Sequence, residues 1–206
     1  MGATDGASPR DGSSDSGAVL VEAVFAIVLL VALVGGVVHV GSTMGVRATV
    51  EHTARTLVRS AAADPSASSD TSLLGALASG LADDAGLRVQ RLIVFRPQDD
   101  GPGIPQVCDQ PPPLNAVPAG VAGVCNIFGA AHLAAVAAGE WPPPGCGPAS
   151  WDAAWCPTTR VHGDAAPLVG VRIDALVEVP ASVGFVPSVG SVVHATAVAA
   201  IDPEVE

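Results

Sequence analysis

Residues 17–40 form one long apolar segment that only Glu22 and His39 interrupt. About 20 apolar residues are enough for an α-helix to cross a bilayer, and this segment has 24 positions. A cleavable secretory signal has a shorter apolar core and a small-residue cleavage site after it. No convincing A-x-A site lies between this segment and Arg47. The sequence therefore predicts a retained single-pass membrane helix, and a buried helix of a soluble protein is the alternative.

Glu22 places a carboxylate near the N-terminal edge of this apolar segment. Acidic residues inside a bilayer cost about 2.5–3.5 kcal/mol at its centre and are usually functional. One interpretation is a boundary residue whose carboxylate reaches the headgroups. The spacing to Gly17 offers another, because cleavage after Gly17 would leave Ala18 as the first residue and Glu22 as the fifth.

Residues 1–16 are rich in Gly, Ser and Asp and contain one basic residue, Arg10. Such a composition cannot form a core and fits a leader. The positive-inside rule does not favour a cytoplasmic N-terminus, because Arg47, Arg55 and Arg59 follow the apolar segment. The N-terminus-inside orientation that we expect therefore depends on the cleavage spacing and on the cysteines.

The composition excludes several classes of function. The net charge of −11 argues against a nucleic-acid partner, which needs a basic patch. The chain has no P-loop or dinucleotide fingerprint and no nucleophile signature. The adjacent carboxylates Asp83-Asp84 and Asp99-Asp100 are interpreted as solvated surface, since neighbours in sequence do not face one another on a helix. We therefore expect neither an enzyme nor a cofactor.

Helices precede strands in the pattern that follows the apolar segment. Residues 41–63 carry apolar side chains at helical spacing, and Asp64-Pro65 should end that helix. Helices followed by a small antiparallel sheet indicate an α+β head. The expected elements are a second helix over residues 72–85 and strands over residues 87–96, 169–179 and 191–201.

The stretch from residue 97 to residue 167 differs from its surroundings. It holds 13 of the 18 prolines, all three tryptophans and all four cysteines. We predict a short helix over residues 126–138 and loop elsewhere. A long loop in a compact domain is usually functional or tied down. We expect Trp141, Trp151 and Trp155 to pack against the proline loops rather than to form a binding surface.

We expect disulfide bonds to hold this loop region in place. Four cysteines allow three pairings, and we prefer the sequential one, Cys108–Cys125 with Cys146–Cys156. Each bridge would contribute about 2–4 kcal/mol and would imply an oxidising compartment. Free thiols are one alternative. A metal site that also uses His132 or His162 is another, although no C-x-x-C spacing is present.

The segment from Gly17 to Glu22, with an apolar helix following at once, resembles the processing site of type IV prepilin-like proteins. With its α-then-β head, the chain resembles the TadE-like family of pilus-assembly proteins, the pseudopilins of the tight-adherence system. Residues 168–173 and 199–203 are similar to the closing strands of high-GC members. Ala18 stands where the main type IV pilins commonly carry an aromatic residue.

This resemblance implies a minor pilin-like subunit with a leader (1–17), a transmembrane helix (18–40) and an extracytoplasmic pilin-like domain (41–206). A prepilin peptidase would cleave on the cytoplasmic side of the membrane. Glu22 would pair with the new N-terminal amine of a neighbouring subunit and set the register. The implied partners are the membrane, the peptidase, other pilin-like subunits and the secretion machinery. Alternatives are an unprocessed, signal-anchored extracytoplasmic binding or sensor domain and, third, an anchored enzyme.

Overall fold

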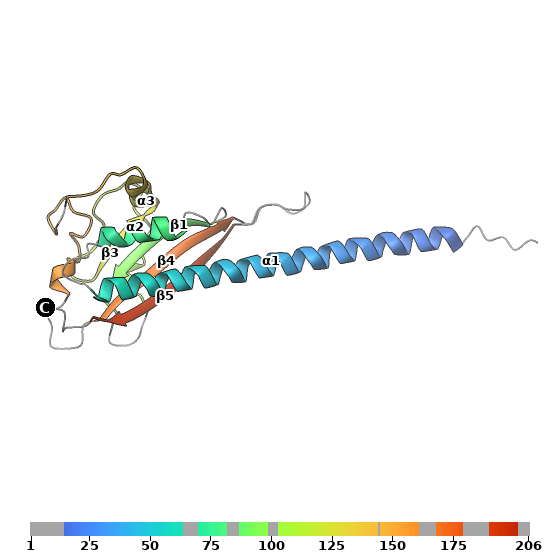
Figure 1. Cartoon of the computed structure of the whole chain (residues 1–206), viewed down its shortest axis with the longest axis horizontal. Coiled ribbons are helices and arrows are strands. Elements are labelled where there is room, and N and C mark those ends of the chain that lie inside the picture. The colour runs from blue at the N-terminus through green and yellow to red at the C-terminus, as the bar shows by residue number, and fades with distance from the viewer. Residues whose placement is uncertain are drawn as a thin grey trace, which may run out of the picture. The chain divides into compact units, whose positions relative to one another are not determined.

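The computed structural model describes residues 15–63, 70–81, 87–98, 103–143, 145–160, 168–178 and 190–201 (Figure 1). The chain divides into two compact units, Met1–Gly41 and Ser42–Glu206. Helix α1 (Asp15–Ala63) contributes its first 27 residues to one unit and its remaining turns to the other. Most of the predicted leader lies outside the described residues.

The C-terminal turns of α1 pack on the head through one face. Val50, Ala54, Leu57, Val58 and Ala61 are buried, at the i, i+3, i+4 spacing of an amphipathic helix. This is the face predicted from the sequence. The helix ends at Ala63, directly before the Asp-Pro pair that was expected to end it, because proline cannot continue the hydrogen-bond ladder.

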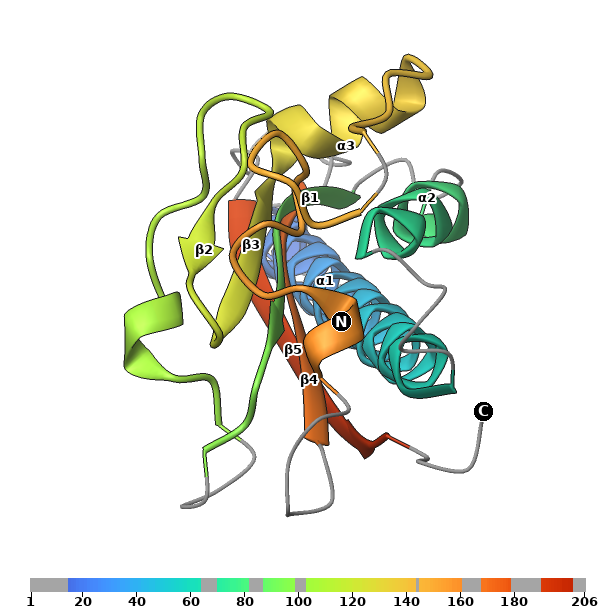
Figure 2. The same ribbon diagram turned by 90° about the vertical axis from the view of Figure 1, so that its left-hand side faces the viewer.

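The head contains one antiparallel sheet with strand order β2-β3-β1-β4-β5 (Figure 2). The three predicted strands are confirmed, with ends that differ by one residue: β1 (Leu87–Phe95), β4 (Leu168–Glu178) and β5 (Gly190–Ala200). β1 is central and pairs with both β3 and β4. In the described part of the chain, β5 pairs only with β4 and is therefore an edge strand.

The predicted helix over residues 126–138 is wrong in its first part. The structure has strand β3 (Cys125–Gly129) there, followed by helix α3 (Ala130–Ala137). All five residues of β3 are buried, so its sequence does not alternate, and a short apolar run cannot be distinguished from a buried helix by periodicity. The predicted loop region also contains β2 (Gly120–Val121) and two short 3-10 helices, η1 (Gln106–Cys108) and η2 (Pro157–Thr159).

Both faces of the sheet are covered. The larger core lies on one face and includes α1 together with α2 (Asp70–Leu81), whose Leu73, Leu74 and Leu77 are buried. The predicted second helix, residues 72–85, thus begins two residues earlier in the structure, and its described part ends at Leu81, four residues earlier. Ile93 and Phe95 alternate with residues of that core and pack on the opposite face with the Cys108–Cys125 pair. The layout is α+β, with α1, α2, α3 and the sheet all contributing side chains to the main core.

The four cysteines form two disulfides, Cys108–Cys125 and Cys146–Cys156. This is the sequential pairing preferred from the sequence. The first bridge ties η1 to β3 and is fully buried. The second closes a loop of the segment that ends in η2.

Candidate functional site

The apolar part of α1 exposes its hydrophobic side chains. Every large hydrophobic residue from Val19 to Val40 is exposed, with fractions from 48% at Val31 to 71% at Phe25. The helix is long and apolar enough to cross a membrane. An exposed apolar surface of this extent marks a site of contact with lipid or protein. The chain therefore carries one candidate single-pass membrane anchor among its described residues.

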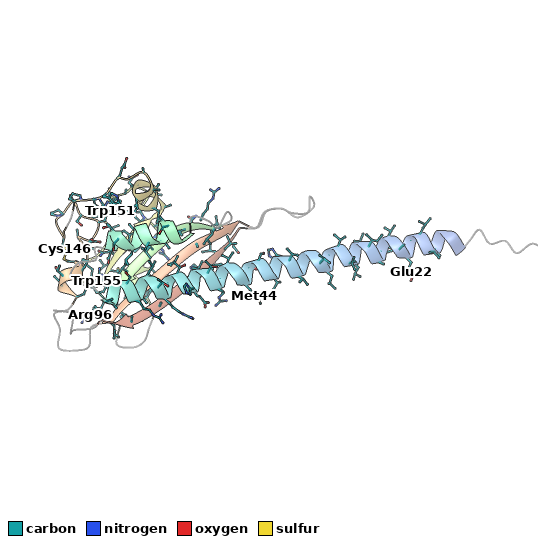
Figure 3. The ribbon with its side chains drawn as sticks, in the orientation of Figure 1. Glu22, Met44, Arg96, Cys146, Trp151 and Trp155 are labelled. Carbon is teal, nitrogen blue, oxygen red and sulfur yellow. A yellow bond between two sulfur atoms is a disulfide. The ribbon has the colours of Figure 1, made fainter. Side chains whose placement is uncertain are left out.

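Gly17, Ala18 and Glu22 lie in the first turns of α1, and all three are exposed. Ala18 and Glu22 are four residues apart, so they share one face of the helix. In the described part of the chain, Glu22 has no hydrogen-bond or ion-pair partner, and Figure 3 shows its side chain directed away from the helix. A lone carboxylate on an apolar helix is costly in lipid unless a cation pairs with it. The arrangement can therefore accept one positively charged group from outside the chain.

A buried polar network joins three separate segments of the head. Arg160 donates to both carboxylate oxygens of Asp70, at 2.7 and 2.6 Å, and both side chains are 1% exposed. Asn126 donates to Asp70 at 2.6 Å and to the Trp155 carbonyl at 2.8 Å, and it accepts from the Trp155 amide. The Arg160 guanidinium also lies 4.2 Å from the centre of the Trp155 ring. These contacts hold α2, β3 and the loop of the second disulfide together.

A second charged cluster lies around Asp174 on β4. Its carboxylate accepts hydrogen bonds from Arg91 and Arg172 at 2.6 and 2.7 Å, and His194 Nδ1 lies 2.7 Å from it. Burial raises the pKa of Asp174, but the hydrogen bonds from Arg172, His194 and Arg91 outweigh it and lower the pKa below its ordinary value. Arg91 also donates to Asp109 at 2.7 Å. Each charge is balanced within the cluster, so its role is to tie three strands to the loop after η1.

This cluster corrects one expectation about β4. The alternation of the strand predicts that Arg172 and Asp174 face solvent, yet Asp174 is only 4% exposed. The reason is that the loop carrying Cys108 and Asp109 covers this face of the sheet. Charged residues inside strands, such as Arg91 in β1 and Asp174 in β4, were the available signal for this cluster, whereas nothing local marked Asp70.

The metal-site alternative needs free cysteine thiolates, and the four cysteines are used in another way. All four cysteines are in disulfides. Both nitrogens of His132 are engaged, Nδ1 accepting from the Gly129 amide and Nε2 lying 2.9 Å from the Val117 carbonyl. Burial lowers the pKa of His132, which favours the neutral ring. In the described ranges no group of three or more His, Cys, Asp or Glu side chains could hold a metal ion, and His162 lies outside them.

The three tryptophans divide into two groups. Trp151 and Trp155 are buried, 6% and 5% exposed, as expected, and Trp151 packs edge-on against His132. Trp141 is 55% exposed and lies close to Gly75 of α2. The adjacent carboxylates at residues 83–84 and 99–100 lie outside the described part of the chain.

The chain matches no family model, no curated protein and no solved structure.

Proposed function

We propose that this chain is a minor pilin-like subunit, a pseudopilin of a tight-adherence type IV pilus system at the cell envelope. The observation that carries the proposal is Glu22. It is the only charged residue in the apolar part of a continuous helix, it is exposed, and it lies five residues after Gly17. The proposed leader ends at Gly17, and the head lies outside the cytoplasm, in agreement with two disulfides.

In this proposal the apolar helix associates laterally with other pilin-like helices in the membrane. The amine created at Ala18 of one subunit pairs with Glu22 of its neighbour. A shift along the helix axis would leave both groups unpaired. Such a shift is unfavourable, because an unpaired charge is expensive in a low-dielectric medium. The pair therefore sets the axial register, and the subunit is then extracted into the growing fibre.

Cleavage is the test of this function. The full chain is co-expressed with a prepilin peptidase or with an inactive variant of it, and the intact mass of the membrane-extracted protein is measured. The expected product lacks residues 1–17 only with the active enzyme. Gly17→Val should block cleavage without disturbing the helix, since a Cβ at Gly17 meets no atom within 4 Å.

The matched control is Gly35→Ala, another glycine of α1 whose Cβ would meet nothing within 4 Å. It should be processed like the parent chain. An intact N-terminus in the presence of an active peptidase contradicts the proposal. That outcome would favour an unprocessed, signal-anchored extracytoplasmic binding or sensor domain.

A further inference from the structure

A groove lies between the C-terminal turns of α1 and the edge strand β5. Arg55, Val58 and Arg59 line one side and residues 196–199 of β5 line the other, around a volume of about 330 Å³. All of these residues belong to the unit that begins at Ser42. Figures 1 and 2 both show β5 beside this part of α1.

The strand side of the groove offers unpaired backbone groups. In an antiparallel edge strand every second residue directs its N–H and C=O away from its neighbour. Two of the four residues from 196 to 199 therefore have free groups, because β5 pairs only with β4 within the described ranges. An extended peptide can add to such an edge through main-chain hydrogen bonds.

The helix side of the groove is positively charged. Arg55 is 68% exposed, and its only described carboxylate partner is Glu51 at 3.7 Å. Arg59 is exposed and has no carboxylate partner in the described part of the chain. The two arginines are one helical turn apart, a rise of about 6 Å. Alternate residues of an extended strand are about 6.6 Å apart, so two carboxylates at positions i and i+2 fit this pair.

The chain contains a segment with this pattern. Residues 202–206 follow β5, lie outside the described part, and have the sequence Asp-Pro-Glu-Val-Glu. In an extended conformation Asp202, Glu204 and Glu206 would share one face and Pro203 and Val205 the other. Pro203 has no backbone N–H to donate. If the acidic residues directed their backbone groups toward β5, the backbone of Pro203 would face the opposite edge, where no hydrogen bond to β5 is needed. The segment could thus pair with β5 while blocking a further strand.

We propose that this groove binds the acidic segment 202–206 of a second copy of the chain as an added strand at β5. The segment must come from a second copy, because too few residues connect it to its own β5. Ile201 is buried in the core, so a segment reversing directly after it in a two-residue turn would place Glu204 opposite Ile201 and Glu206 opposite Ala199. Its acidic residues would reach only the near end of the groove. The inference does not depend on the proposed function, because it concerns the head and involves no cleavage.

Peptide binding tests the charge recognition. A fluorophore-labelled peptide with the sequence of residues 200–206 is titrated with the chain truncated after Ile201, in detergent micelles, and its anisotropy is measured. Arg55→Gln and Arg59→Gln should each weaken binding about threefold to fivefold, as expected for exposed ion pairs, and salt should weaken it further. Arg47→Gln is the matched control, because Arg47 is exposed on the same helix but does not line the groove.

The outcomes are decisive in either direction. No binding of the peptide, equal binding of its Asn/Gln analogue, or equal losses from Arg47→Gln and Arg59→Gln would overturn the proposal. The identity of the occupant is tested in the full chain with a photo-crosslinking residue at Val205. A cross-link between two copies, lost in the Arg55→Gln/Arg59→Gln variant, supports the second copy. A cross-link within one copy, or none, refutes that assignment whether or not processing after Gly17 occurs.

Discussion

The buried ion pair between Asp70 and Arg160 supports a quantitative prediction. Asp70→Ala removes three hydrogen bonds, two from Arg160 and one from Asn126. It leaves the guanidinium at 1% exposure without its counter-charge. Removing one partner of a buried pair costs about 3–5 kcal/mol. Since domains have total stabilities of about 5–15 kcal/mol, this loss should lower the melting temperature by on the order of 10 °C.

Guanidinium unfolding of the full chain in micelles, followed by tryptophan fluorescence, measures this loss. Trp151 and Trp155 are buried and Trp155 contacts Arg160, so their emission should shift to the red as the loop detaches. The control is Glu51→Gln, which removes the exposed pairs with Arg47 and Arg55 and should cost at most about 1 kcal/mol.

A double variant separates lost pairing from lost packing. Asp70→Leu/Arg160→Met replaces both charges with apolar side chains, a change that is often neutral or stabilising at buried pairs. We expect its cost to be at least about 2 kcal/mol smaller than the sum of the two single substitutions. Two results would refute the reasoning that this pair anchors α2 to the loop. One is a loss of unfolding free energy below about 1 kcal/mol for Asp70→Ala at an unchanged m value. The other is a double variant whose cost equals the sum of the costs of the two single substitutions.

Two further predictions concern the sheet. The pKa of Asp174 is lowered in the folded state, so its pairing stabilises the head above the ordinary aspartate pKa of about 3.9 and is lost as the pH falls through the lower folded-state value. Asp174→Asn should therefore be less stable than the parent chain at pH 7 and should flatten the acid limb of a stability–pH curve, and an unchanged acid limb would contradict this. Gly170→Ala should cost about 1–3 kcal/mol in denaturant titrations, because the new Cβ would lie 2.4 Å from the Phe95 ring. Gly35→Ala, which meets no neighbour, should not be destabilising, and equal effects of the two substitutions would count against the packing argument.

Local patterns sufficed for much of the fold. The strands β1, β4 and β5 could be predicted to within a residue because their apolar composition or alternation is carried by neighbouring positions. The buried face of α1 beyond Ser42 followed from helical spacing in the same way. β3 could not be recognised, since burial on both faces removes the alternation on which a strand assignment depends.

The features of the candidate site also separate into those set by residues close in sequence and those set by the tertiary structure. The sequence by itself determined the apolar segment, its single acid and the spacing from Gly17 to Glu22, because each is a relation between residues close in the chain. Only the tertiary structure decided which buried charges meet: Asp70 with Arg160 across 90 residues, and Arg91 with Asp174 across 83. It also placed Arg55 and Arg59 beside residues 196–199 of β5. These relations depend on strand order and on how the helices cover the sheet, and no local periodicity encodes either.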